Sequence, residues 1–387
     1  MNCTNLITLN LRINNFRGDL SAYNFSTLHN LHTIDLGNNN FTGSFPLTLT
    51  SCMFLTAIRL SRNKIEEQIS PTILALVSLS YLSITNNNLS NITGAIRILM
   101  GCKNLRMLLL CKIFFHEAIP DENQITISSY AFQNLVVLGI GDCEIKGQIP
   151  TWLGKLKKLL VLDLGSNQIT GPIPGWLGNM PNLFYIDLSY NSISGEFPKE
   201  FCGLPALALQ EAKNRADGNQ LQLPLFVPET KCALYNQQYN KLFSLPPAIY
   251  LRNNGLNGSI PIEIGNVMFL HVLDLSLINF SGEIPDPIFQ LTKLEGLDFS
   301  ENNLHGKIPL SLVDLHFLSS FSVANNDLQG QYHQERHNSC DFIHPRTDVW
   351  DWPNESSNNE LHYGIIAGVV LDSSLDLLVG CFIPFIG

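Results

Sequence analysis

The stretches LLVLDLGSNQITGPIP (159–174) and LFYIDLSYNSISGEFP (183–198) are two copies of one pattern, and they begin 24 residues apart. At the centre of each copy, side chains alternate with the period of a β-strand. In the second copy, Ile186 and Leu188 are expected on the buried face of the strand and Asp187 on the opposite face. We expect the strands of successive copies to stack into one parallel sheet.

The pattern recurs along most of the chain. Twelve copies of L-x-x-L-x-L-x-x-N-x-L-x-G-x-I-P begin at Leu6, Leu31, Leu55, Leu79, Leu105, Leu135, Leu159, Leu183, Pro246, Leu270, Leu294 and Leu318, and a degenerate thirteenth is expected to begin at Leu207. A fixed period with this spelling is the signature of leucine-rich repeats. The sequence therefore predicts a leucine-rich repeat solenoid, with a parallel β-sheet on the concave face and short 3-10 helices and loops on the convex face.

An inward asparagine and a turn glycine complete the pattern. Nine of the twelve copies keep the asparagine, as at Asn191, where its amide can bond backbone groups that burial would leave unpaired. Cys143 replaces it in one copy, and Ile113 and Ile278 interrupt the ladder in two others. The glycine that follows, such as Gly195, permits a tight turn.

The composition fits a large folded core and disfavours one class of partner. The chain has 387 residues, of which 45% are hydrophobic and 14% charged, which argues against disorder. Its 61 Leu and 39 Asn residues suit a repeat that needs both in every coil. The formal net charge of −10 disfavours nucleic acid, because neutralising phosphates requires an excess of Lys and Arg.

The spacing of the copies also divides the chain. We expect repeats over 1–206 and 246–330, separated by an island over 207–245 that includes the degenerate copy. An insertion in a solenoid often loops out over the binding face, whereas a decayed repeat has no such role. The residues alone leave both alternatives open.

The two chain ends do not follow the repeat. No signal-peptide pattern and no polar cap precede Leu6, so we expect a chain truncated at both ends. Residues 331–362 are polar and juxtamembrane-like. Residues 363–387 are apolar except for Asp372 and Asp376, each of which opposes membrane insertion by roughly 2.5–3.5 kcal/mol. This last segment is therefore expected to be at most a degraded transmembrane helix.

Three motifs are similar to those of one receptor family. The runs LPPAIYLRNNGLNGSIP (245–261) and HFLSSFSVANNDLQG (316–330), with the island ending in QYN (238–240), resemble receptors for tyrosine-sulfated peptides. These are the phytosulfokine receptors and the tyrosine-sulfated glycopeptide receptor, which belong to the plant receptor-like kinases with Ile-Pro repeats. The resemblance covers about residues 1–330. It implies a single-pass receptor at the plasma membrane, an extracellular solenoid and a cytoplasmic kinase that this sequence lacks.

The resemblance further implies where a ligand binds. In the family a short peptide lies along the concave face, pairs as a strand with the island and anchors its sulfate on an arginine. The matching positions here are Arg12, Arg59, Ser83, Thr85 and Asp163 in the repeats and Phe226 and Val227 in the island. Cys111 stands where the family prefers a hydroxyl group, which weakens that contact. Without the family, the arginines would be interpreted mainly as solvated strand residues.

Patterns of catalysis or metal binding are absent from the sequence. It has no H-E-x-x-H, no glycine-rich phosphate loop, no H-R-D and no D-F-G, so we expect no enzyme activity, metal or cofactor. A recurring acid at one strand position is interpreted as a habit of the repeat rather than as an acid–base pair. These acids are Asp35, Asp163, Asp187, Asp274 and Asp298.

Cysteines and sequons give two further predictions. Cys202 and Cys232 flank the island, and a disulfide between them and two separate buried thiols are both open alternatives. Eight N-x-S/T sequons fit a secreted glycoprotein. They begin at Asn2, Asn24, Asn40, Asn88, Asn91, Asn257, Asn279 and Asn354.

Two functions therefore remain open. The first is the ligand-binding region of a plant peptide-hormone receptor of the sulfated-peptide class, with a leucine-rich repeat kinase as co-receptor. The second is a receptor-like or decoy protein that binds another protein partner, for example in defence. The membrane is a partner only if residues 363–387 insert.

Overall fold

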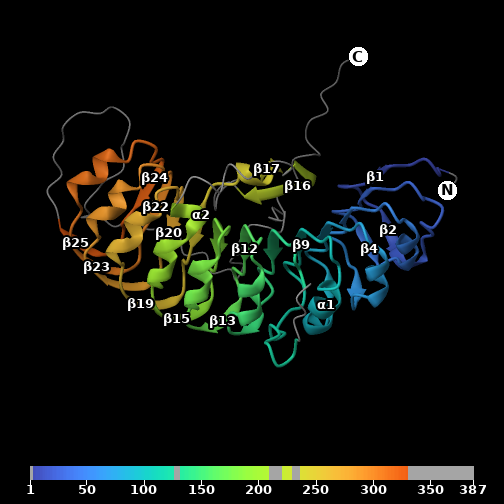
Figure 1. Cartoon of the computed structure of the whole chain (residues 1–387), viewed down its shortest axis with the longest axis horizontal. Coiled ribbons are helices and arrows are strands. Elements are labelled where there is room, and N and C mark those ends of the chain that lie inside the picture. Colours follow the sequence, from blue (N-terminus) through green and yellow to red (C-terminus); the bar gives the residue numbers. More distant parts are fainter. Residues whose placement is uncertain (1–2, 126–130, 209–219, 229–235, 330–387) are drawn as a thin grey trace, which may run out of the picture.

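A computed structural model describes residues 3–125, 131–208, 220–228 and 236–329. The coils stack into an arc, with the N-terminal coils at one end and the C-terminal coils at the other (Figure 1). One large sheet lines the inner side of this arc, and short helices and a second sheet follow the outer side. This is the predicted leucine-rich repeat solenoid.

The inner sheet holds twelve parallel strands within the described residues, one from each of the twelve regular copies. Each strand is three residues long, and neighbouring strands keep one common register, as for Asp163, Asp187 and Tyr250. The strands are β1 (Thr8–Asn10), β3 (Thr33–Asp35), β5 (Ala57–Arg59), β7 (Tyr81–Ser83), β9 (Met107–Leu109), β10 (Val137–Gly139), β12 (Val161–Asp163), β14 (Tyr185–Asp187), β18 (Ala248–Tyr250), β20 (Val272–Asp274), β22 (Gly296–Asp298) and β24 (Ser320–Ser322).

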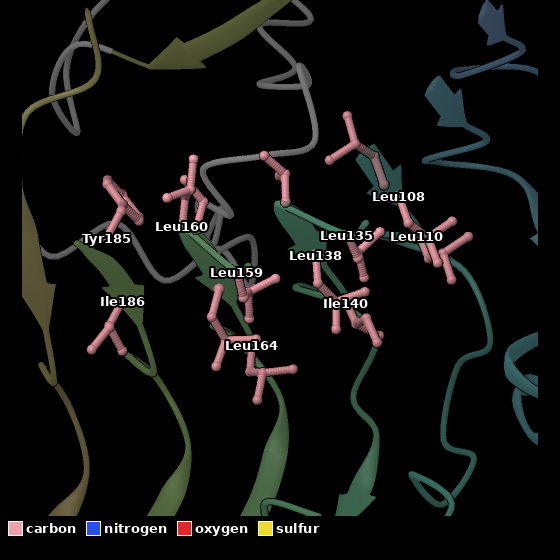
Figure 2. Packing of buried hydrophobic residues seen from close by; sticks show 14 of the residues in the cluster. Leu108, Leu110, Leu135, Leu138, Ile140, Leu159, Leu160, Leu164, Tyr185 and Ile186 are labelled. Atoms are coloured by element: carbon pink, nitrogen blue, oxygen red, sulfur yellow. The ribbon is translucent and has the colours of Figure 1, made fainter. Parts of the chain in front are cut away.

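Inward side chains of these strands form one continuous core. Ile186 and Leu188 are fully buried, as predicted. Figure 2 shows Leu138, Leu164 and Ile186 from neighbouring coils on one face of the sheet, whereas Leu160 and Tyr185 project from the other face. Full burial of one such aliphatic side chain contributes about 1.5–3 kcal/mol, so the stack of coils stabilises itself through repeated small terms.

The inward asparagines form the predicted ladder. The Asn191 Nδ2 donates to the carbonyl oxygens of Leu164 at 3.0 Å and Leu188 at 3.1 Å, which joins two consecutive coils. Its Oδ1 accepts a hydrogen bond from the Ile169 amide at 2.9 Å. The same arrangement recurs at Asn39, Asn63, Asn87, Asn167, Asn254, Asn302 and Asn326.

The exceptions to the ladder are also explained. The Cys143 thiol donates to the carbonyl oxygens of Leu110 at 3.3 Å and Gly141 at 3.2 Å, so sulfur takes over part of the bonding of the amide. Ile113 and Ile278 are buried in the core and supply apolar contact instead.

In each coil, a residue with the left-handed backbone conformation follows the inner strand. The residue directly before the ladder position has φ between 52° and 57° in all twelve coils. These residues are Ile13, Asn38, Arg62, Asn86, Lys112, Asp142, Ser166, Tyr190, Asn253, Leu277, Glu301 and Asn325. The repeated pattern of leucines gave no indication of this conformation, which costs an ordinary L-residue roughly 1–2 kcal/mol.

The outer side of the arc carries the second sheet and the helices. Its seven strands are β11 (Lys146–Gly147), β13 (Gln168–Gly171), β15 (Ser192–Glu196), β19 (Gly255–Ser259), β21 (Asn279–Gly282), β23 (Asn303–Lys307) and β25 (Asp327–Gln329). Two short pairs, β2 (Arg17–Asp19) with β4 (Asn40–Thr42) and β6 (Glu66–Glu67) with β8 (Asn88–Leu89), lie in the N-terminal coils. The turn glycines here have positive φ, as at Gly171 and Gly195.

Helices on this side are short because each spans only the return from the outer to the inner sheet. Helix α1 (Ile92–Leu99) begins at Asn91, whose side chain accepts a hydrogen bond from the Gly94 amide at 2.9 Å. Most 3-10 helices begin directly after the proline of the pattern, which fixes φ for the first turn. They span Leu20–Ala22, Leu47–Ser51, Pro71–Ala75, Thr151–Lys155, Gly175–Asn179, Lys199–Gly203, Leu242–Ser244, Ile262–Asn266, Asp286–Gln290 and Leu310–Asp314.

The island departs from the stack of coils. Strand β14 pairs directly with β18, so the degenerate copy predicted at Leu207 adds no strand to the inner sheet. Leu207 lies in α2 (Pro205–Ala208), is buried, and accepts a hydrogen bond from the Phe269 amide at 2.9 Å. Two further segments of the island, β16 (Gln220–Pro228) and β17 (Asn236–Lys241), form an antiparallel hairpin on the concave side (Figure 1).

Predictions for the C-terminal segments, 331–362 and 363–387, fall outside the described residues. Within the part that the structure does describe, no helix combines the length and apolar character needed to cross a membrane.

Candidate functional site

The concave face presents two columns of outward side chains. Because the inner strands share one register, equivalent residues of successive strands lie next to one another. The first column contains Asn10, Asp35, Arg59, Ser83, Leu109, Gly139, Asp163, Asp187, Tyr250, Asp274, Asp298 and Ser322. Arg12 and Thr85 belong to the second column, two residues further along each strand. The five predicted repeat residues therefore lie on one surface.

Arginines gather at the N-terminal end of this surface. Arg12 is half-buried, and burial followed by repulsion from Arg59 lowers its pKa. Burial followed by repulsion from Arg12 also lowers the pKa of Arg62. Arg12 is thus close enough to both Arg59 and Arg62 for repulsion between the charges, and the three arginines create a local positive region in a chain of net charge −10.

Arg59 is held differently from the other two arginines. Its Nη1 lies 2.9 Å from Asp35 Oδ2, and its Nη2 donates to the Tyr81 hydroxyl at 2.7 Å and to the carbonyl oxygen of Pro224. Arg59 is 5% exposed. Burial acts to lower its pKa, but Tyr81 and Asp35 outweigh this effect, so the pKa of Arg59 is raised. The sequence predicted an outward ligand contact here, whereas the guanidinium is buried among groups of the same chain.

Two predicted hydroxyl residues lie beside Arg59. Ser83 is buried, and its Oγ lies 2.6 Å from the Oγ of Ser61. Thr85 is fully buried, and its Oγ1 has no hydrogen-bond partner within the described residues. An unpaired buried hydroxyl costs roughly 1–3 kcal/mol.

Asp163 lies in the middle of the face. It is fully buried, and its Oδ1 accepts a hydrogen bond from the Gly165 amide at 2.9 Å. Its Oδ2 lies 3.8 Å from the Cys111 thiol, a weak donor at the position where a hydroxyl group would bond more strongly.

Further acids continue the first column toward the C-terminal end. Asp187 Oδ1 accepts hydrogen bonds from the amide of Ser189 at 2.9 Å and from its hydroxyl at 2.5 Å. Burial raises the pKa of Asp187 to about 7, against the opposing effect of these bonds. Burial likewise raises the pKa of Asp274, which bonds Ser276 in the same way. Each acid thus bonds a serine two residues later, which supports the interpretation as a habit of the repeat.

The hairpin forms a roof over this surface. In its backbone register Phe226 lies opposite Gln238 and Val227 opposite Gln237. Strands β16 and β17 form a two-stranded sheet, so each has one edge that pairs with no strand among the described residues. An open strand edge offers backbone donors and acceptors to a further strand.

Apolar outward residues provide the seat for the hairpin. Tyr81, Met107, Val137, Val161 and Tyr185 occupy the outward start of five consecutive inner strands, and all are buried. Leu223 and Leu225 of β16 are buried in the same hydrophobic cluster. Tyr185, Asp187 and Ser189 lie on the outward face opposite Ile186 and Leu188, and they are nevertheless buried because they lie in the covered middle of that face. The apolar residues at these outward strand positions are the sequence feature that could have predicted a covered surface.

The base of the hairpin makes one further aromatic contact. The ring of Phe184 stacks on that of Phe243 at a centroid distance of 5.7 Å. Phe184 belongs to the coil just before the island and Phe243 to the helix just after β17. This contact ties the C-terminal end of the island to the coil of β14.

The remaining predicted sites are placed as follows. Cys202 is a buried free thiol whose pKa burial raises to about 12, and Cys232 lies outside the described residues. Among the sequons, Asn24, Asn88, Asn91, Asn257 and Asn279 are exposed and Asn40 is half-exposed, while Asn2 and Asn354 are not described. In the described ranges, no three His, Cys, Asp or Glu side chains converge as a metal site would require.

Comparison with known proteins defines the class first. Models of the family "Leucine rich repeat" match residues 133–193, and also 30–52 and 293–315. The crystal structure of a TDR receptor superposes with a TM-score of 0.61 at 24% identity, covering 84% of this chain and 52% of that one. The chain is a leucine-rich repeat solenoid.

Relatives then narrow the family. Receptor-like protein 3 of Arabidopsis thaliana is 52% identical over 257 residues, which are 66% of this chain and 34% of that protein. Phytosulfokine receptor 1 of Arabidopsis thaliana is 44% identical over 198 residues, 51% of this chain and 19% of the receptor. The chain belongs to the plant leucine-rich repeat receptor-like proteins, and it spans about a third or less of these two relatives.

One solved complex adds a related receptor. The Arabidopsis receptor kinase HAESA, in complex with the peptide hormone IDA and the co-receptor SERK1, has a TM-score of 0.58 at 25% identity. The alignment covers 84% of this chain and 50% of HAESA.

Proposed function

We propose that this chain is the ligand-binding region of a plant peptide receptor and that its concave face binds a short tyrosine-sulfated peptide. The carrying observation is the hairpin of β16 and β17, which lies over the concave face with a strand edge that pairs with no other strand of the described residues. A peptide that adds to this edge gains main-chain hydrogen bonds, while side-chain contacts with the sheet below give selectivity. Phe226 and Val227 are the proposed pairing residues.

The positive region supports the sulfated class of ligand. Arg12 and Arg62 both carry a lowered pKa, caused by burial and by neighbouring arginine charge, so an anion placed there would relieve repulsion. Arginine suits a sulfate because its planar fork can bond two oxygens at once. Neighbouring inner strands lie about 4.8 Å apart. An extended peptide of about five residues is therefore long enough to cross the four strands from β1 to β7.

The central residues of the face support polar contacts to such a peptide. The Thr85 hydroxyl is buried without a partner among the described residues, Ser83 lies two residues before it, and Asp163 lies three strands further along the inner sheet. We propose these three residues as ligand contacts on the basis of the resemblance, and because all three are buried in the unliganded chain, contact with a peptide requires displacement of the residues that cover them. The chain contributes recognition and no catalysis, and by analogy with the receptor complex of HAESA a co-receptor is its second partner, at the extracellular face of the plasma membrane.

Deletion of strand β16 of the hairpin tests the proposal. Residues 221–228 are removed, and peptide affinity and circular dichroism are compared with those of the intact chain. We expect peptide binding to disappear while the dichroism of the solenoid is nearly unchanged, because β14 and β18 pair without help from the island. Equal affinity after deletion would place the site elsewhere.

A second candidate has one observation in its favour. Receptor-like protein 3 matches a larger share of this chain than the phytosulfokine receptor does. A receptor-like protein that binds another protein on the same concave face would retain the solenoid and show no preference for a sulfated peptide. The deletion experiment and the sulfation comparison below separate the two.

A further inference from the structure

We infer that Asp35, Arg59 and Tyr81, here called the arginine latch, position the hairpin over the concave face rather than contact the ligand. This inference rests on the proposed function for its consequence in binding. The position of the hairpin is itself a property of the unliganded chain and is testable without any peptide.

The bonds of Arg59 carry the inference. Its Nη1 donates to Asp35 at 2.9 Å, and its Nη2 donates to both the Tyr81 hydroxyl, at 2.7 Å, and the Pro224 carbonyl oxygen. Its Cζ lies 5.5 Å from the centroid of the Tyr81 ring. The guanidinium therefore joins β3, β5 and β7 of the inner sheet to β16, which is 165 residues distant in sequence.

The local structure of β16 explains why the latch acts at Pro224. The register between β16 and β17 is irregular from Gln220 to Leu225. Proline is tolerated in such a stretch, because no ladder amide is needed there. In the same stretch, the Gln222 Oε1 accepts a hydrogen bond from the Ser80 hydroxyl at 2.7 Å.

Polar and apolar contacts have separate roles in this docking. Leu223 and Leu225 bury apolar surface, which is favourable but tolerates sliding along the sheet. The buried bonds of the latch have fixed directions, so they select one position. Phe226 follows the latched stretch directly, and the latch therefore determines where the open edge lies above the sheet.

An arginine suits this role better than a lysine. Its five donors have a fixed fork geometry and can serve acceptors on three different groups at once. Asp35 compensates the buried charge, and loss of either partner would leave the other charge unpaired. Arg252 lies in the second column with its Cζ 5.8 Å from the centroid of the Tyr190 ring, and it provides a matched concave arginine for comparison.

Amide hydrogen exchange of the full chain tests the inference. The variants are Arg59→Lys, Tyr81→Phe, and the double variant Asp35→Asn with Arg59→Gln, which leaves no unpaired charge if single variants misfold. We expect amides of β16 and β17 to exchange about tenfold faster or more in Arg59→Lys and the double variant, with a smaller effect in Tyr81→Phe. Amides of the inner sheet should be unchanged, and Arg252→Lys should behave as the wild type. Wild-type exchange of the hairpin in both Arg59 variants would overturn the inference.

Peptide binding separates the latch from a ligand contact. The probes are a short tyrosine-sulfated peptide and its unsulfated form. In Arg59→Lys we expect both to bind more weakly by the same factor, because the hairpin is displaced while the anion contact remains. Selective loss of the preference for sulfate would make Arg59 a ligand contact and overturn the inference. If wild type binds neither peptide, the proposed function fails, and the exchange experiment alone decides the position of the hairpin.

Discussion

Arg12 and Arg59 show that the same side chain takes different roles at different outward positions of one sheet. Arg59 is buried because an acid stands at its position in the previous coil, a tyrosine begins the next strand, and the hairpin covers all three. Arg12 lies in the first coil and is only half-buried. The neighbours of an arginine on this sheet thus decide how much of its surface remains exposed.

The ladder gives the first prediction at this scale. Asn191→Ala removes three contacts to carbonyl oxygens, those of Leu164, Leu188 and Ser189, and one contact to an amide in a partly buried turn. We expect the free energy of unfolding, from urea denaturation, to fall by roughly 1–3 kcal/mol. Asn191→Cys is the control and should lose less, because Cys143 bonds equivalent carbonyls in its own coil. Wild-type stability of Asn191→Ala would refute the inward assignment.

A buried acid gives the second prediction. The folded-state pKa of Asp187 is raised to about 7, above the unfolded value of about 3.9, so the folded state binds the proton more tightly. Its contribution to stability is complete below about pH 4 and is lost as pH rises through about 7. Asp187→Asn removes this dependence and keeps an oxygen acceptor for Ser189.

Denaturation at pH 5 and pH 8 measures the effect. The free energy of unfolding of the variant relative to wild type should be higher at pH 8 than at pH 5 by about 1–3 kcal/mol. The same difference between the two proteins at both pH values would show that Asp187 does not titrate in this range.

At the scale of elements, the inner strands were predictable and the contacts of the hairpin were not. Each of the twelve regular copies supplies one inner strand, because alternating burial and the inward asparagine are local properties of the sequence, whereas the degenerate copy at Leu207 supplies none. The partners of Arg59 were missed because Pro224 is 165 residues away and no local pattern joins them. The apolar outward residues, such as Met107 and Val137, did indicate a covered surface, since a solvated face has no use for them.

The left-handed turn after each strand was also missed, because the leucine pattern constrains burial and not backbone dihedral angles. It gives a prediction for two adjacent coils, in which Asn253 and Leu277 occupy the same position with φ of 53°. Asparagine tolerates this conformation better than leucine. We expect Leu277→Asn to raise the free energy of unfolding by about 1 kcal/mol and Asn253→Leu to lower it by a similar amount, as measured by urea denaturation. Effects of the same sign in both variants would contradict the explanation.

For the whole molecule, the distribution of charge matters more than the net charge of −10. Arginines gather in the first three coils, whereas Asp163, Asp187, Asp274 and Asp298 extend along the later strands of the same column. An acidic peptide meets a repulsive global field and must be held by a local feature. The arginines of the first three coils lie on the same concave face as the hairpin, which Arg59 contacts directly. One extended ligand could therefore bind the arginines through its charge and pair with the open edge of the hairpin through its backbone.

Calorimetric titration with a short tyrosine-sulfated peptide and its unsulfated form tests the central claim most directly. Wild type should bind the sulfated form more tightly. Arg12→Ala should weaken that binding about tenfold to a hundredfold, because a charge-assisted hydrogen bond contributes roughly 1.5–3 kcal/mol, and should abolish the preference for sulfate. Arg252→Ala, a concave arginine in a later coil, should retain both affinity and preference. If neither peptide binds, or if the preference survives in Arg12→Ala, the assignment of a sulfated-peptide site at the N-terminal end of the concave face is wrong.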